Sequence, residues 1–242
     1  MNKTLIFTAT YNESKNIEEL ISKIFNSNTN IDLLIVDDNS PDKTYEIIEK
    51  LSAKNKNIFL KKRDKKYGLN TAHTYGYDFA VKRNYEKLIT MDADLSHDPI
   101  EIPKIINYLD SKPFVIGSRY VDGGKNDMTK GRLLLSRLGN KFIKTLLAPN
   151  CTEFTSSYRG FNLKNIKNFH FKQIQSNGYS FFMETVIKLN YMGYYSYEFP
   201  IHFKNREFGE SKIPKGEIYR TLYNVIRLYF HFLKKKININ FD

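Results

Sequence analysis

The sequence contains no tryptophan and only one cysteine in 242 residues. A single cysteine excludes a disulfide framework and a thiolate-rich metal site, and it favours a reducing compartment. No apolar run approaches the roughly 20 residues that a membrane-spanning helix needs. Acidic residues are also scarce, 26 against 38 lysines and arginines, which gives a formal net charge of +12. This excess indicates either polyanionic partners, such as nucleic acid, an anionic membrane or phosphorylated substrates, or simply a basic solvated surface.

The first 120 residues alternate between strand and helix patterns. Short apolar runs predict buried parallel strands, at 5–7, 33–36, 58–60, 88–91 and 114–116. Apolar residues at helical spacing predict helices buried on one face, over 17–25, 44–51 and 102–109. Ser40-Pro41 and Asp98-Pro99 predict the N-caps of the last two helices. The fold expected is a single α/β, Rossmann-like domain with a mostly parallel central sheet flanked by helices.

Beyond residue 120 the alternation becomes looser. We expect a polar loop over 121–131, a helix over 132–147, a strand over 195–203 and a charged loop over 204–216. We expect the α/β domain to occupy 1–215, with an amphipathic helix and tail over 216–242. In this helix one narrow polar stripe interrupts an apolar surface, and lysines follow it; the stripe is Arg220, Asn224, Arg227 and His231. Such a helix suits a bilayer surface, and packing on its own sheet or on a partner subunit is the alternative.

Two acidic clusters come directly after predicted strands. In doubly wound sheets, ligands bind beyond the carboxyl ends of the strands. Asp92-Ala93-Asp94 places two carboxylates where they can bind Mg²⁺ or Mn²⁺, whose shell substrate phosphates usually complete. Asp37-Asp38 is suited to ribose hydroxyls or base N–H groups. The alternatives are a turn role for the first pair and interaction with a helix dipole for the second.

Basic residues gather in two later segments, at Arg119, Arg132 and Arg137, with Ser136 beside the last of them, and at Arg206 and Lys212. Arginine pairs with phosphate oxygens bidentately, and lysine supplies a point charge. A diphosphate leaving group needs this neutralisation because charge builds on it as the bond breaks. Solvated surface charge is the alternative for each residue taken alone. The histidines match no zinc pattern, and His97 is expected to be a loop residue rather than a base.

These motifs together resemble the family 2 glycosyltransferases of the GT-A fold, and among them the polyprenol-phosphate (dolichol-phosphate) mannosyltransferase group. The resemblance runs in order over nearly the whole chain. The matching motifs are Ala9-Thr10-Tyr11-Asn12-Glu13, Val36-Asp37-Asp38-Asn39-Ser40-Pro41-Asp42, Gly68-Leu69-Asn70-Thr71-Ala72, Met91-Asp92-Ala93-Asp94-Leu95-Ser96-His97-Asp98-Pro99, Gly117-Ser118-Arg119-Tyr120, Arg132-x-x-x-Ser136-x-x-x-Asn140, Glu198-Phe199-Pro200-Ile201 and Arg206-x-x-Gly209-x-Ser211-Lys212.

The resemblance implies a role for each matching position. It places the nucleoside of the donor at Ala9, Tyr11, Glu13, Val36 and Asp38, with Ala93 against the nucleotide. It makes Asp92 and Asp94 the ligands of Mg²⁺ or Mn²⁺, with Asn140 as a further ligand. It implies that donor or acceptor phosphates are bound by Arg119, Arg132, Ser136, Arg206 and Lys212. The catalytic set it implies is Asp92, Asp94, Arg119, Arg132 and Ser136.

The sequence departs from the family pattern in a few places. The family usually has Pro at the position of Ala9. Its Asp-x-Thr-Ser-Gly-Phe-Arg stretch is here Glu153-Phe154-Thr155-Ser156-Ser157-Tyr158-Arg159, so that a longer carboxylate and a serine replace Asp and Gly. A Trp common in the polar loop is missing. Without any Trp, the chain also lacks the Gln-x-x-Arg-Trp motif of processive members, which excludes the cellulose- or hyaluronan-type polymerases.

The expected function is therefore inverting transfer of a sugar, mannose from GDP-mannose, to a polyprenyl or dolichyl phosphate. The alternative is a same-fold enzyme that uses another donor, such as UDP-glucose, and a sugar hydroxyl, with Glu153 as a candidate base. A basic nucleic-acid-binding or scaffold protein is disfavoured because the charge does not gather in a recognised binding motif. We expect a cytoplasmic protein held peripherally at the cytosolic face of an anionic membrane, with a membrane partner subunit left open.

Overall fold

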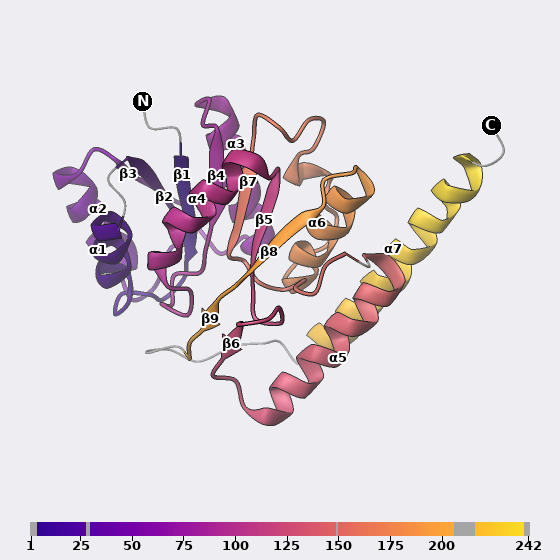
Figure 1. Ribbon diagram of the computed structural model, residues 1–242. Helices are drawn as coiled ribbons and strands as arrows, with labels where there is room; N and C mark the ends of the chain where they lie inside the picture. Colours follow the sequence, from indigo (N-terminus) through magenta and orange to yellow (C-terminus); the bar gives the residue numbers. More distant parts are fainter. Residues whose placement is uncertain (1–3, 28–29, 149, 206–215, 240–242) are drawn as a thin grey trace.

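The computed structural model describes residues 4–27, 30–148, 150–205 and 216–239. A central sheet has the strand order β3-β2-β1-β4-β7-β5-β8, with helices on both faces (Figure 1). The strands are β1 (Thr4–Thr10), β2 (Ile31–Asp37), β3 (Ile58–Lys62), β4 (Lys87–Thr90), β5 (Phe114–Ser118), β7 (Arg159–Asn162) and β8 (Ser196–Pro200). All pairs are parallel except those of β7, which lies antiparallel between β4 and β5. The predicted mostly parallel α/β sheet is confirmed.

The helices include every one that the sequence predicted. They are α1 (Ile17–Ser27), α2 (Thr44–Lys54), α3 (Leu69–Lys82), α4 (Ile102–Ser111), α5 (Lys130–Leu147), α6 (Tyr179–Tyr191) and α7 (Glu217–Ile239), with short 3₁₀ turns at Pro99–Glu101 and Phe171–Gln173. The expected loop over 121–131 contains a short strand, β6 (Lys125–Asn126), which pairs with β9 (His202–Phe203). The expected strand over 195–203 is accordingly divided into β8 and β9.

Alternation along β1 builds the two halves of the core. Leu5 and Phe7 point to one face of the sheet, where they join side chains of α3 and α6. Ile6 points to the other face and packs with α1 and α4. Gly76 lets α3 approach this sheet closely, because a Cβ at that position lies only 2.4 Å from the Phe7 ring. The sheet is thus buried on both faces, as its continuous apolar strands predict.

One of the two predicted helix starts is wrong. Asp98 does cap the turn at Pro99, since its carboxylate accepts a hydrogen bond from the N–H of Ile100. Ser40 does not cap α2, which begins four residues later, after Lys43 in a left-handed conformation. The Ser40 hydroxyl instead donates to Asp37 at 2.6 Å, because the chain makes an additional turn there before it enters the helix.

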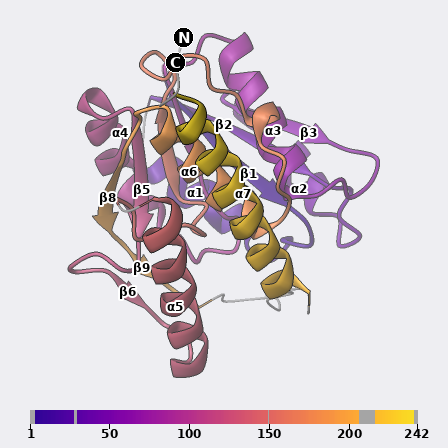
Figure 2. The same ribbon diagram turned by 90° about the vertical axis from the view of Figure 1, so that its right-hand side faces the viewer.

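The last helix lies beside α5 and packs on α6 (Figures 1 and 2). Part of its polar stripe faces the domain, at Asn224 and Arg227, whereas Arg220 and His231 are exposed. Asn224 is buried, and the Arg227 guanidinium donates to Glu184 of α6 at 2.7 Å and to the Ser176 hydroxyl at 3.0 Å. The side chains on the opposite side of α7 therefore point outward. No helix in the described ranges has the length and apolar character to cross a bilayer.

Candidate active site

An open cleft of about 250 Å³ lies at the carboxyl ends of β1, β2 and β4. These parallel strands end at the same edge of the sheet, where doubly wound proteins bind ligands. The predicted site residues that line the cleft are Ala9, Tyr11, Glu13, Asp38, Asp92, Ala93 and Asp94. Val36, also predicted to hold the nucleoside, is fully buried within β2 and does not line the cleft.

The turns after β1 and β2 are tied together by Asp37. Its buried carboxylate accepts hydrogen bonds from the Thr10 hydroxyl at 2.8 Å and from the Ser40 N–H at 2.9 Å. Asp37 is therefore a structural residue, and it is the next residue, Asp38, that reaches the cleft.

One end of the cleft combines acidic, basic and aromatic side chains. The Arg63 guanidinium is ion-paired with Asp38 and also donates to the Thr71 hydroxyl at 2.7 Å. The ammonium group of Lys66 lies 4.0 Å from the centre of the Tyr11 ring. Carboxylates here suit ribose hydroxyls, and an aromatic face suits a nucleobase. Arg63 and Lys66 were not predicted, because in the sequence they belong to a run of basic residues that is typical of a solvated surface.

Hydroxyl groups hold the two carboxylates that follow β4. The Ser157 hydroxyl donates to Asp92 Oδ1 at 2.6 Å. The Ser96 hydroxyl and N–H donate to Asp94 Oδ1 at 2.5 and 3.1 Å. Two fixed carboxylates facing a cleft fit a hard cation such as Mg²⁺ or Mn²⁺. Across the described ranges there is no group of three or more His, Cys, Asp or Glu that could hold a metal ion.

His97 is buried beneath this pair. Its Nδ1 accepts a hydrogen bond from the Asp92 N–H at 3.2 Å, and its ring stacks on Tyr158 with 5.0 Å between centroids. Burial lowers the pKa of His97, although the nearby carboxylates oppose this. A neutral ring that accepts at Nδ1 carries its proton on Nε2. His97 therefore supports the backbone at Asp92, in agreement with its prediction as a loop residue.

Arg119 lies inside the protein and pairs with Glu153. Its Nε and one terminal nitrogen donate to the two carboxylate oxygens of Glu153 at 2.7 and 2.8 Å. Both side chains are buried, and neither lines the cleft. Glu153 also accepts hydrogen bonds from the N–H groups of Thr155 and Ser156, at 3.1 and 3.0 Å. In this structure Arg119 thus organises the loop beside the cleft, and its contact with phosphate stays a prediction.

The predicted residues of α5 do not line the cleft. Ser136 shares a 2.6 Å hydrogen bond with the Tyr120 hydroxyl, and Arg132 is exposed. The Asn140 side chain accepts from the Phe154 N–H at 3.1 Å and donates to the Ser136 carbonyl at 2.9 Å. Its amide thus joins α5 to the rest of the domain, and its role as a metal ligand stays a prediction. Arg206 and Lys212 lie outside the described residues.

Several residues of the cleft were not predicted as site residues. They are Thr10, Lys66, Leu69, Ala72, Thr155, Ser157, Tyr179 and Phe182. Thr155 and Ser157 belong to the stretch 153–159, which departs from the family pattern. That departure indicated an altered local geometry but did not identify these two residues as part of the site. Tyr179 and Phe182 come from α6, a helix that was not predicted from the sequence.

Comparisons with known proteins agree with this geometry. The sequence model of the family described as glycosyl transferase family 2 matches residues 5–169. The undecaprenyl-phosphate mannosyltransferase of Micrococcus luteus is 31% identical over 226 residues, which cover 93% of this chain and 93% of that protein. The polyprenol monophosphomannose synthase of Mycolicibacterium smegmatis is also 31% identical over 226 residues, covering 92% of this chain and 85% of that protein.

Solved structures share the fold. Glucosyl-3-phosphoglycerate synthase from Mycobacterium tuberculosis, in complex with Mn²⁺, UDP and glucosyl-3-phosphoglycerate, superposes with a TM-score of 0.59 at 14% identity, over 93% of this chain and 77% of that chain. A mannosyltransferase from Pyrobaculum calidifontis, in complex with GDP-Man and Mn²⁺, gives 0.54 at 16% identity, over 88% of this chain and 58% of that chain. Both of those structures contain Mn²⁺.

Proposed function

Because this chain belongs to glycosyl transferase family 2 and is a glycosyltransferase, we propose that it transfers mannose from GDP-mannose to a polyprenyl or dolichyl phosphate. The observation that carries the proposal is the pair Asp92 and Asp94, fixed in a cleft at the carboxyl end of a buried parallel strand. The two curated relatives are named for mannose and for polyprenyl phosphates, which supports this choice of sugar and acceptor. The product is a lipid-linked sugar donor for glycan assembly.

The proposed reaction is a single displacement. A phosphate oxygen of the lipid attacks the anomeric carbon of mannose, the bond from that carbon to the diphosphate breaks, and the configuration inverts. A phosphate monoester is already anionic near neutral pH, so it needs no general base. A sugar hydroxyl does need one, and the candidate base Glu153 is buried in its ion pair with Arg119. The site therefore favours a phosphate acceptor over the alternative.

Different residues of the cleft would bind the metal ion and the nucleoside of the donor. Asp92 and Asp94 would hold Mg²⁺ or Mn²⁺, which supplies positive charge that stabilises the departing nucleoside diphosphate. Tyr11 offers its ring and Asp38 its carboxylate to the nucleoside of the donor. Phosphate contacts from Arg119, Arg132, Ser136, Arg206 and Lys212 are part of the proposal, on the strength of the family motifs that these residues match.

Replacing either acidic ligand tests this proposal. We expect Asp92→Asn and Asp94→Asn each to lower the rate of mannose transfer by at least about a hundredfold, since a neutral amide is a poor ligand for a hard cation. The matched control is Asp110→Asn, which removes the charge of an exposed carboxylate that pairs with Lys87 and does not line the cleft. Full activity in Asp92→Asn or Asp94→Asn would overturn the metal assignment.

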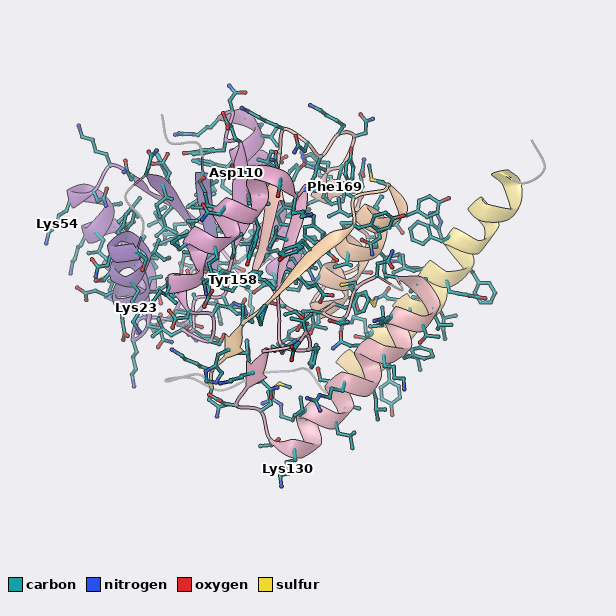
Figure 3. All side chains as sticks on the ribbon, viewed as in Figure 1. Lys23, Lys54, Asp110, Lys130, Tyr158 and Phe169 are labelled. Carbon is teal, nitrogen blue, oxygen red and sulfur yellow. The ribbon has the colours of Figure 1, made fainter. Side chains whose placement is uncertain are left out.

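The outer surface of α5 and α7 supports a second proposal, that this face docks on an anionic membrane at the cytosolic side. Large apolar side chains on both helices are exposed: Leu134, Leu135, Leu138, Phe142, Leu146, Tyr219, Leu222, Tyr223, Ile226, Tyr229 and Phe230. Asn224, Val225 and Leu228 of α7 are buried against the domain, so the apolar side chains of this helix named above point outward. Figure 3 shows Lys130 at the N-terminal end of α5, directed away from the sheet. Apolar area with flanking positive charge is what an anionic bilayer surface binds.

A further inference from the structure

The pairing of β4 with β7 brings Ser157 opposite Asp92. In this antiparallel pair Thr90 lies across from Arg159 and Ile89 across from Gly160. Continuing the same register two residues beyond the strands places Asp92 across from Ser157. The contact is made, with 2.6 Å between the Ser157 hydroxyl and Asp92 Oδ1. Cross-strand neighbours of this kind interact directly, so the topology of the sheet selects which residue touches the carboxylate.

Ser157 is itself held firmly. Its carbonyl accepts a hydrogen bond from the Thr90 hydroxyl at 2.5 Å, and the residue is only 2% exposed. The preceding residues of its loop are fixed by Glu153, through the N–H groups of Thr155 and Ser156. A hydroxyl on a fixed backbone is a precise donor, because the acceptor cannot turn away without leaving a buried donor unpaired.

The hydrogen bond determines how Asp92 is presented to the cleft. With Oδ1 accepting from Ser157, the carboxylate is kept from rotating freely about its χ angles, and Oδ2 remains for a ligand. Asp94 is treated in the same way by Ser96. Groups that orient a metal ligand commonly change metal affinity by about 10- to 100-fold when they are removed.

We propose that Ser157 is a positioning residue that orients Asp92 for the divalent cation and the donor diphosphate. This inference rests on the proposed metal-dependent function. Ser157 thereby makes a hydrogen bond to Asp92 that a glycine at this position could not make. It gives this chain a tighter cation site than the same loop with glycine.

The test is the affinity for Mn²⁺ in the presence of GDP, measured by the electron paramagnetic resonance signal of free Mn²⁺, with no sugar donor and no turnover. We expect Ser157→Ala and Ser157→Gly to weaken Mn²⁺ binding by about 10- to 100-fold. In assays, the KM for Mn²⁺ should rise while kcat at saturating Mn²⁺ stays within about twofold. Ser156→Ala is the matched control, since the Ser156 hydroxyl accepts from the Tyr158 N–H.

Two results would overturn the inference. One is an unchanged Mn²⁺ affinity in both Ser157 variants, and the other is an equal loss in Ser156→Ala, which would point to loop packing instead. Melting temperatures identify a variant that fails to fold, and the second Ser157 variant then decides. Asp92→Asn separates this inference from the proposed function. If Asp92→Asn also binds Mn²⁺ normally, the metal site itself is misassigned. If Asp92→Asn loses Mn²⁺ binding while Ser157→Ala keeps it, only the role of Ser157 is rejected.

Discussion

The buried ion pair between Arg119 and Glu153 supports the loop that borders the cleft. The pKa of Glu153 is below its usual value: burial alone would raise it, but the Arg119 guanidinium and the N–H groups of Thr155 and Ser156 outweigh burial. A carboxyl whose pKa is lower in the folded state stabilises the fold above its unfolded pKa. That stabilisation disappears as the pH falls through the folded pKa.

Glu153→Gln tests this pair through stability. We expect the free energy of unfolding in urea at pH 7 to fall by about 3–5 kcal/mol, because the change leaves the Arg119 charge buried without its partner. The difference between wild type and variant should shrink as the pH falls into the range where Glu153 protonates. Glu49→Gln, at an exposed position on α2, is the control. A loss no larger than that of the control would contradict the account.

At the residue scale, the sequence predicted those site residues that follow parallel strands. Asp38, Asp92 and Asp94 come directly after apolar runs, and the carboxyl ends of parallel strands meet at one edge. Ser157 could not be predicted, because it meets Asp92 only through the antiparallel pairing of β7. The pairing of Arg119 with Glu153 could not be predicted either, because an arginine suits both a buried bidentate ion pair and a phosphate contact.

At the scale of elements, α6, α3 and β7 were not predicted from the sequence, and each omission has a physical reason. Residues Ser180 to Ile187 of α6 are all buried, so the helix has no polar face to produce a helical period. The buried side of α3 includes His73 and Gly76, which do not register as apolar. The short strand β7, with the sequence Arg-Gly-Phe-Asn, is central in the sheet, and its Arg159 is satisfied by the backbone carbonyls of Phe154, Ser156 and Phe182.

Helix α7 carries the prediction for membrane docking. We expect the double variant Leu222→Glu and Ile226→Glu to reduce partition onto vesicles of anionic phosphatidylglycerol by at least about tenfold, because each change removes exposed apolar area and adds repulsive charge. Val81→Glu with Ile100→Glu is the matched control, since both residues are exposed and apolar but lie away from α5 and α7. Equal partition of wild type and the α7 variant would reject the docking face. If wild type bound the vesicles only in the presence of a membrane partner subunit, the face would bind that subunit and not the bilayer.

At the scale of the whole molecule, the cleft proposed for the donor is connected through α6 to the helix α7 that is proposed to bind the membrane. The cleft opens at the carboxyl edge of the sheet, and α6, which supplies Tyr179 and Phe182 to the cleft, is bonded to α7 through Glu184 and Arg227. The helix with the outward apolar face is therefore attached directly to an element of the active site. The excess of positive charge, +12 overall, suits a diphosphate donor, a lipid phosphate and an anionic surface.

The measurement that tests the central claim most directly follows radiolabelled mannose from GDP-mannose in the presence of undecaprenyl phosphate and Mn²⁺. The account predicts that the label passes into the organic phase, and that omission of the lipid phosphate or addition of EDTA prevents this. UDP-glucose, labelled in the glucose and supplied in place of GDP-mannose, should give far less organic product. Label that stays in the aqueous phase, or that moves to a sugar hydroxyl acceptor without lipid phosphate, would contradict the account.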